Sequence, residues 1–366
     1  MMIAIIGAGP VGSYAASLLA GDFEVKVFEE HPGVGLPVQC TGIVTQEIFN
    51  FIPKKSDFVL NKVDEIRIFS PNNKFLKLSF EKPDIILDRQ KFDQYFYNLA
   101  RRNGAEFFFN HRFSSIQTST APATVKVIDL KSGRMKKFKF SHLIGADGPL
   151  SPVAKDAGIF GNRKFFTGIQ AVVKKRNSNI IDFYPMKKGF GWAVPEDRNT
   201  LRIGVASEAN PREQFNHLLK RYKGKVVAKQ GGIIPIFNPA ASVRKENVFL
   251  AGDAAGFVKA TTGGGLVPGL QSAEILAKSI IRSQSYEIGV YLKIYPSLLL
   301  NLQMRNTMNT FDQKDWNELI RDLNNSSSKK ALQNINRDRL FQLLLNVSIN
   351  NPGILKYGFK HFPDMF

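Results

Sequence analysis

Three glycines near the start of the chain stand where a turn could bind a pyrophosphate. Residues 3–6 predict a strand and residues 13–19 a helix, and the turn between them supplies five candidate cofactor contacts, Gly7, Gly9, Pro10, Val11 and Gly12. Gly7 permits a sharp turn, Gly9 lets backbone amides approach phosphates, and Gly12 lets the helix pack closely on the strand. The positive end of the helix dipole would face the phosphates.

A second predicted strand, residues 24–29, ends in an acidic pair. Glu29 follows the glycines by about twenty residues, where a carboxylate accepts hydrogen bonds from both ribose hydroxyls of an adenosine and repels a 2′-phosphate. Glu30 is the alternative for this role. The order of strand, glycine turn, helix, strand and acid predicts a Rossmann-type unit that binds a dinucleotide.

Two further segments combine glycine with an acidic residue. Residues 145–148 contain Asp147 between two glycines, and Gly252 and Asp253 follow the apolar run 248–251. A carboxylate at the end of such a strand can accept hydrogen bonds from ribityl hydroxyls. The small residues around Asp253 let a dinucleotide approach the backbone.

A glycine run opens a helix predicted over residues 266–281. It supplies four more candidate cofactor contacts, Gly263, Gly264, Gly265 and Leu266. Free amides at the start of this helix would face the pyrimidine edge of an isoalloxazine ring. They would stabilise the negative charge that this ring carries when it is reduced.

In order and spacing, the N-terminal glycine turn, residues 145–148 and residues 250–256 resemble motifs of the FAD-dependent oxidoreductases built like aromatic hydroxylases. The resemblance spans residues 1–285 and implies an α/β fold with a discontinuous Rossmann-type FAD-binding domain, an antiparallel-sheet substrate domain and a C-terminal helical region. Alternating apolar residues between 165 and 236 also favour an antiparallel sheet. The expected bounds are 1–60, 88–160 and 240–285 for the FAD-binding domain, 61–87 and 161–239 for the substrate domain, and 286–366 for the helical region.

Three narrower segments are similar to motifs of the geranylgeranyl reductase family. Residues 37–42 look like its Pro-x-x-Cys-(Ala/Thr)-Gly signature, residues 88–93 like its Asp-Arg-x-x-Phe-Asp helix start, and residues 190–195 like its Tyr-x-Trp-x-Phe-Pro motif. The resemblance implies an FAD enzyme that saturates carbon–carbon double bonds of geranylgeranyl chains. Hydride would come from N5 of the reduced flavin, and the substrates would be membrane ether-lipid precursors.

The same resemblance assigns roles to individual residues. Cys40 would lie near the flavin as a candidate proton donor or positioner, with Thr41 beside it, and Arg89 would contact the cofactor. The expected lipid contacts are Phe190, Trp192, Pro195 and, from a neighbouring predicted strand, Tyr184.

Two positions depart from the patterns of these families. Ala260 stands before the glycine run where the reductases usually have proline, so this loop would be less constrained. Ala154, followed by Lys155, stands where hydroxylases of this fold usually carry arginine. The second departure weakens a hydroxylase interpretation more than a reductase interpretation.

The composition of the chain limits the kinds of partner that it is expected to bind. A net charge of +19 would attract nucleic acid or an anionic membrane, but the basic pairs are dispersed and lack a nucleic-acid-binding signature. Thirty phenylalanines together with this charge indicate a hydrophobic ligand at an anionic surface.

The single cysteine excludes an intrachain disulfide and a Cys-based zinc site, and the histidines lack metal-ligand spacing. No apolar run reaches eighteen residues, so we expect a cytoplasmic protein, peripheral to the membrane, without metal.

Two other functions remain open from the sequence. One is a flavin monooxygenase or halogenase that acts on a small hydrophobic substrate. The other is a non-catalytic binder of anionic lipid or RNA. The sequence contains no second glycine fingerprint for NADPH and no cysteine cluster for iron and sulfur, so electrons would come from a separate carrier protein or a transiently bound nicotinamide.

Overall fold

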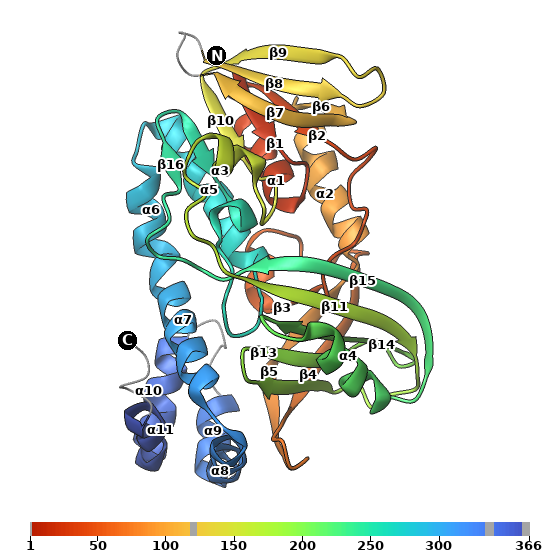
Figure 1. The fold of residues 1–366 in the computed structure, drawn as a ribbon, viewed down its shortest axis with the longest axis vertical. Coiled ribbons are helices and arrows are strands. Elements are labelled where there is room, and N and C mark those ends of the chain that lie inside the picture. The colour runs from red at the N-terminus through yellow and green to blue at the C-terminus, as the bar shows by residue number, and fades with distance from the viewer. Residues whose placement is uncertain (1, 118–122, 334–339, 361–366) are drawn as a thin grey trace.

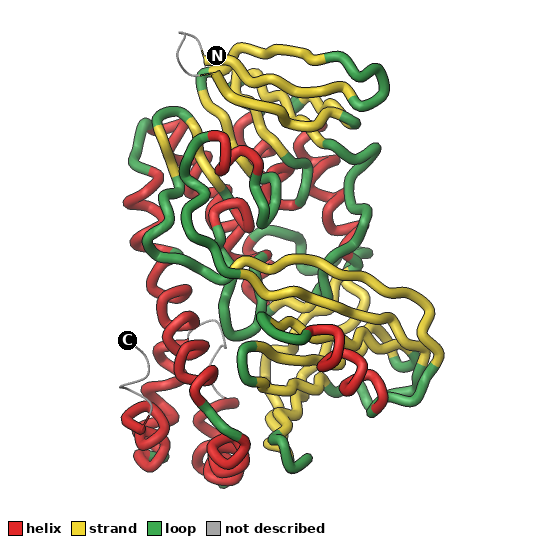
Figure 2. The backbone as a smooth tube through the Cα atoms, viewed as in Figure 1, coloured by secondary structure: helices red, strands yellow, loops and turns green. Residues whose placement is uncertain are grey.

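The computed structural model describes residues 2–117, 123–333 and 340–360. Two large sheets lie one above the other in the view of Figure 1, and a column of C-terminal helices runs beside both. The chain crosses between the two sheets several times, so each sheet is built from segments far apart in the sequence (Figure 2).

The first sheet has six strands in the order β16-β17-β10-β1-β2-β6. Its strands are β1 (Met2–Ile6), β2 (Glu24–Glu29), β6 (Glu106–Phe109), β10 (His142–Gly145), β16 (Arg244–Lys245) and β17 (Val248–Leu250). All pairs are parallel except β16–β17. Four consecutive residues of β1 are buried, as expected for a strand that is covered on both faces.

Helices and a small sheet cover the six-stranded sheet. Helix α1 (Pro10–Leu19) packs against α2 (Arg89–Arg102) and α5 (Leu266–Arg282). The small antiparallel sheet consists of β7 (His111–Gln117), β8 (Ala123–Asp129) and β9 (Met135–Phe140). Phe138 of β9 packs on Phe28 of β2, with ring centroids 4.8 Å apart. Part of the phenylalanine surplus therefore serves the core of this domain.

The second sheet has eight strands in the order β15-β11-β14-β13-β12-β4-β5-β3. These are β3 (Ile43–Val44), β4 (Val59–Phe69), β5 (Phe75–Leu87), β11 (Phe165–Lys174), β12 (Ile181–Met186), β13 (Gly189–Asp197), β14 (Thr200–Ser207) and β15 (Lys225–Pro235). The antiparallel prediction is confirmed, with one parallel pair between β4 and β12. Helix α4 (Pro211–Lys220), which we did not expect, packs on one face through Phe215 and Leu218.

The C-terminal region is helical, as predicted. Its helices are α6 (Tyr286–Lys293), α7 (Tyr295–Thr310), α8 (Gln313–Leu323), α9 (Ser326–Gln333), α10 (Leu340–Asn350) and α11 (Leu355–Lys360). The chain breaks between α6 and α7, and Pro296 lies in the first turn of α7, where a proline needs no N–H partner. Helices α8 and α9 pack against β5.

The remaining elements are short. They are α3 (Pro152–Asp156) and the 3₁₀ turns η1 (Gln46–Asn50), η2 (Gly252–Ala255) and η3 (Pro352–Ile354). The expected domain bounds stay a prediction, although β3 and the start of β4 pair with the eight-stranded sheet. Within the described ranges, no helix has both the length and the apolar character that crossing a bilayer requires.

Candidate functional site

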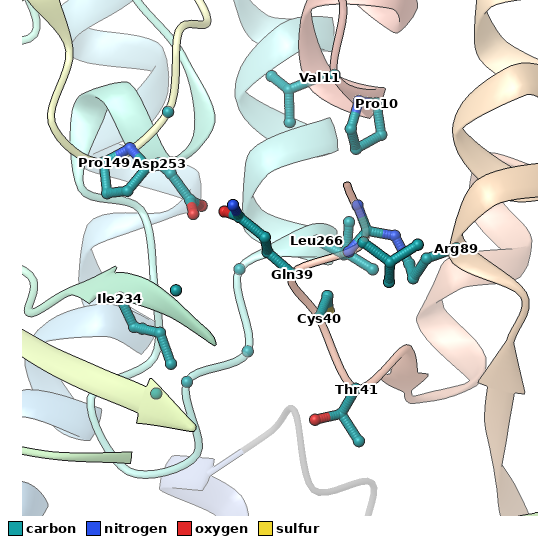
Figure 3. A pocket seen from close by; sticks show the side chains of 18 of the residues that line it. Pro10, Val11, Gln39, Cys40, Thr41, Arg89, Pro149, Ile234, Asp253 and Leu266 are labelled. Atoms are coloured by element: carbon teal, nitrogen blue, oxygen red, sulfur yellow. The ribbon is translucent and has the colours of Figure 1, made fainter. Parts of the chain in front are cut away.

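A cavity of about 760 Å³ lies between the carboxyl ends of β1, β2 and β10 and one face of the eight-stranded sheet. Its upper part is lined by the N-terminal glycine turn, and its middle by the Cys40 segment and the loop before α5 (Figure 3). Its lower part is lined by β12, β13 and α7. Of the predicted site residues, only Gly12, Tyr184, Pro195 and Gly252 lie outside its lining.

The three glycines of the N-terminal turn do different work. A Cβ on Gly12 would lie 2.0 Å from the carbonyl oxygen of Gly7, and one on Gly7 would lie 2.4 Å from the carbonyl oxygen of Ala146. Both positions therefore need glycine for packing. A Cβ on Gly9 would meet nothing within 4 Å, because Gly9 faces the cavity. This open backbone suits the approach of a pyrophosphate.

Glu29 is fixed at the cavity wall by its neighbours. Its Oε2 accepts a hydrogen bond from the Ala8 amide at 2.8 Å, and its Oε1 accepts one from the His31 amide at 2.9 Å. The carboxylate is thereby held beside the glycine turn, as an acid that binds ribose hydroxyls must be. Glu30 also lines the cavity but has no such support among the hydrogen bonds of the described residues.

Asp147 and Gly252 stabilise the backbone around the cavity. Asp147 accepts hydrogen bonds from the Ser151 hydroxyl at 2.7 Å and the Val153 amide at 2.9 Å, at the start of α3. Burial raises the pKa of Asp147, and these two hydrogen bonds oppose the shift. Gly252 has a φ of +61°, and its amide donates to the Ser272 hydroxyl. Its role is to join η2 to α5.

Asp253 is a buried acidic residue that lines the cavity. Burial raises its pKa to about 6, and the positive charge of Arg89 only partly opposes this. In Figure 3 its carboxylate points toward the Gln39 amide across the crevice. A Cβ on Gly265 would lie 2.9 Å from Asp253 Oδ1, so the glycine run lets this carboxylate approach the loop.

We predict that Asp253→Asn changes how the stability of the FAD-free protein depends on pH. A carboxyl with a raised folded pKa stabilises the fold fully below its unfolded pKa of about 4, and this contribution is lost as pH rises through about 6. Chemical unfolding should therefore show wild type losing on the order of 2 kcal/mol relative to the variant between pH 4 and 7. FAD affinity should fall in the variant. Parallel stability profiles of the two proteins would contradict the shifted pKa.

The predicted Arg89 and Cys40 are brought together at the start of α2. Asp88 caps this helix, and the Arg89 guanidinium donates to both oxygens of Asp93 at 3.1 Å. Although burial opposes the charge, Asp93 and the Cys40 thiol raise the pKa of Arg89. The Cys40 sulfur also accepts a hydrogen bond from the Gly42 amide. Cys40, Thr41 and Arg89 all line the cavity.

Three residues that we did not predict hold the Cys40 segment on the eight-stranded sheet. Gln230 donates to the Cys40 carbonyl at 3.2 Å, and Arg202 donates to the Thr41 carbonyl and to Leu87. Gln170 Oε1 accepts from the Thr41 hydroxyl at 2.7 Å and from the indole of Trp192 at 2.8 Å. In the sequence, Arg202 stands out because it is an arginine within the apolar run that forms β14.

The lower part of the cavity is apolar. Phe183, Phe190, Trp192 and Val194 face it from β12 and β13, and Met304 and Met308 face it from α7. The lining residues of β13 are spaced by two, because side chains of a strand alternate between its faces.

The predictions for Tyr184 and Pro195 need correction. Because of this alternation, both residues point to the opposite face of the sheet from Phe183 and Val194, and neither lines the cavity. Tyr184 stacks on Phe69 with centroids 4.8 Å apart, and its hydroxyl bonds to that of Tyr222. It belongs to the core under α4.

The residues present fit FAD. The cavity offers an open glycine turn at a helix N-terminus, a held carboxylate for a ribose and, at its middle, Asp253 beside the glycine run. Within the part of the chain that the structure describes, no group of three His, Cys, Asp or Glu side chains is arranged to hold a metal ion.

Comparisons with known proteins agree with this fit. An FAD binding domain model matches residues 68–211, and an NAD(P)-binding Rossmann-like domain model matches residues 5–49. Digeranylgeranylglycerophospholipid reductase 3 of Methanosphaera stadtmanae is 28% identical over 78% of this chain and 79% of its own length. The corresponding reductase of Methanococcus vannielii is 25% identical over 97% of this chain and 96% of its own.

Solved structures share the fold. A geranylgeranyl bacteriochlorophyll reductase-like protein from Thermoplasma acidophilum superimposes with a TM-score of 0.84 at 19% identity, over 100% of both chains. The flavin-dependent halogenase CmlS superimposes with a TM-score of 0.71 at 16% identity, over 99% of this chain and 78% of its own.

Fold and cavity together define a flavoprotein with a Rossmann-type FAD-binding part, an antiparallel sheet and C-terminal helices. Within this class, the chain is an FAD-dependent oxidoreductase that resembles the geranylgeranyl reductases. The resemblance indicated by its sequence motifs is thus confirmed.

The glycine turn provides a matched pair of variants. Gly9→Ala should fold with nearly unchanged thermal stability, because space exists for the methyl group, but should bind FAD more weakly, since this group occupies the approach to the turn. Gly12→Ala should lower the melting temperature of the FAD-free protein, because its methyl group meets backbone that cannot move aside. Thermal unfolding and FAD titration measure the two effects, and equal loss of stability in both variants would refute this division.

Proposed function

We propose that this chain reduces carbon–carbon double bonds of geranylgeranyl chains, with membrane ether-lipid precursors as its substrates. The observation that carries the proposal is the apolar chamber directly below the FAD site, lined by aromatic and aliphatic side chains of β12, β13 and α7. The names of the similar reductases support the same substrate class.

The side chains of the chamber would exclude water and align the chain. When bound, reduced FAD supplies a hydride. An isolated alkene has no carbonyl to polarise, so the protein needs to hold the chain against the flavin and provide a proton. Phe190 and Trp192 would orient the chain, because they form one wall of the chamber. Cys40 lines the same cavity and interacts with Arg89, and its thiol is the candidate proton donor of this proposal.

The decisive assay uses anaerobic protein reduced with dithionite and a geranylgeranylated glycerophospholipid. Mass spectrometry should show successive gains of two hydrogens in the lipid while the flavin is reoxidised. A flavin that stays reduced, with the lipid unchanged, would count against the proposal. Oxygen-dependent NADPH oxidation that increases with an aromatic substrate would instead support a monooxygenase.

Cys40→Ala tests the proton donor. The variant should keep its yellow colour, because the thiol makes only weak contacts with the Gly42 amide and Arg89, yet reduce the lipid at least about tenfold more slowly. Cys40→Ser, which keeps a hydroxyl group, should be less impaired. Turnover equal to wild type in Cys40→Ala would remove Cys40 from the mechanism.

We further propose that an external carrier protein or nicotinamide supplies the electrons, and that the chain acts at the surface of an anionic membrane. The charge of +19 supports the second point. Helix α6 adds an apolar face, on which Ile288 is 61% and Leu292 73% exposed, with Tyr291 between them and Lys293 beside them. Aromatic and aliphatic side chains next to basic ones suit the interface of an anionic bilayer.

Vesicle sedimentation tests this membrane contact. Binding to vesicles that contain anionic phospholipid should exceed binding to zwitterionic vesicles and should weaken as salt rises. The double variant Ile288→Glu with Leu292→Glu should bind less, whereas Val227→Glu, at an exposed valine of β15, should bind like wild type. Equal binding of all three proteins would exclude α6 as the contact.

A further inference from the structure

Arg305 of α7 is a charged side chain that is almost wholly enclosed, with 1% of its surface exposed. Its guanidinium donates to three backbone carbonyls, those of Ala260 and Thr261 at 3.0 Å and that of Gly189 at 3.1 Å. The ring of Phe190 also lies 5.5 Å from its central carbon. The side chain thus joins three elements that are distant in the sequence.

The charge of Arg305 has no near counter-ion within the described ranges, where no carboxylate comes within 4.0 Å of it. Burial lowers its pKa to about 10, and Glu208 only partly opposes this shift. The guanidinium therefore remains charged at neutral pH, and its nearest stabilising groups among the described residues are the three backbone carbonyls. A buried charge without a near ionic partner is costly, and the hydrogen bonds to three carbonyls offset part of this cost.

The carbonyls that Arg305 holds belong to residues that line the FAD cavity or directly precede its lining. Ala260 and Thr261 lead directly into the glycine run before α5, and Gly189 begins β13, the strand that carries Phe190 and Trp192. One turn earlier on α7, Asn301 accepts a hydrogen bond from the Thr261 hydroxyl. The loop is therefore attached to α7 at two neighbouring points.

We infer that Arg305 is a positioning residue for the flavin end of the site, which fixes the loop before α5 and adds a positive charge behind it. Ala260 lacks the stiffness of a proline, and the guanidinium supplies the restraint through hydrogen bonds. The N-terminus of α5 faces the same loop with its positive dipole end. Both charges favour a flavin that carries a negative charge when reduced.

Three variants of the FAD-loaded protein distinguish the effect of the Arg305 charge from the effect of attaching the loop before α5 to α7. Arg305→Met removes the charge, Arg305→Lys keeps it with fewer hydrogen bonds, and Asn301→Leu removes only the second attachment of the loop. The first readout is the midpoint potential of the FAD without substrate. The second is the affinity for sulfite, which forms a negatively charged adduct with oxidised flavin.

Arg305→Met should make the midpoint potential more negative and weaken sulfite binding about tenfold, as expected for the loss of one nearby charge. Arg305→Lys and Asn301→Leu should stay close to wild type in both readouts. If the methionine variant does not retain FAD, Arg305→Gln replaces it with the same expected signs. Equal values in all variants, or an equal shift in Asn301→Leu, would overturn the inference. None of these readouts depends on the lipid substrate.

Discussion

The whole site depends on how closely the backbone of the glycine turn approaches β10. Gly7 and Gly12 leave no room for side chains between β1, α1 and Ala146. This contact sets the direction of α1 and leaves Gly9 open to the cavity. The same contact holds the segment with Asp147 beside the turn. The positions of the adenosine, pyrophosphate and flavin parts of the site are therefore set together.

Local signals explain why much of this arrangement could be predicted. The glycine turn, the Asp88 cap of α2 and the glycine run before α5 each combine residues that are close in sequence, and the conformations they favour are formed within one or two turns. The alternation in the eight-stranded sheet was equally readable. The same alternation shows that Pro195 faces away from the cavity, because Trp192 and Val194 face it and neighbouring side chains of a strand point to opposite faces. For the same reason, Tyr184 points away from the face on which Phe183 lies. The family motif at residues 190–195 contains side chains of both faces of β13, so the motif alone does not distinguish them.

Long-range polar contacts were not predictable from sequence. Gln170, Gln230 and Arg202 hold the Cys40 segment from strands more than a hundred residues further along the chain, and Arg305 connects α7 with the loop before α5 and with β13. Gln170 and Arg202 are polar side chains within apolar runs, which shows that they are unusual but not what they contact. Gln230 and Arg305 stand close to other polar residues and lack this signal. Only the register of the sheets and the packing of α7 identify the partners.

The order of strands in the six-stranded sheet has a consequence for biosynthesis. The central strand β1 leaves the ribosome first, but its neighbour β10 follows more than a hundred residues later, and β17 and α5 only after residue 248. The complete lining of the cavity therefore exists only after the loop before α5 has been synthesised. Until then, β10 lacks its neighbour β17, and α1 lacks the cover of α5, so apolar surface that favours aggregation stays exposed during synthesis.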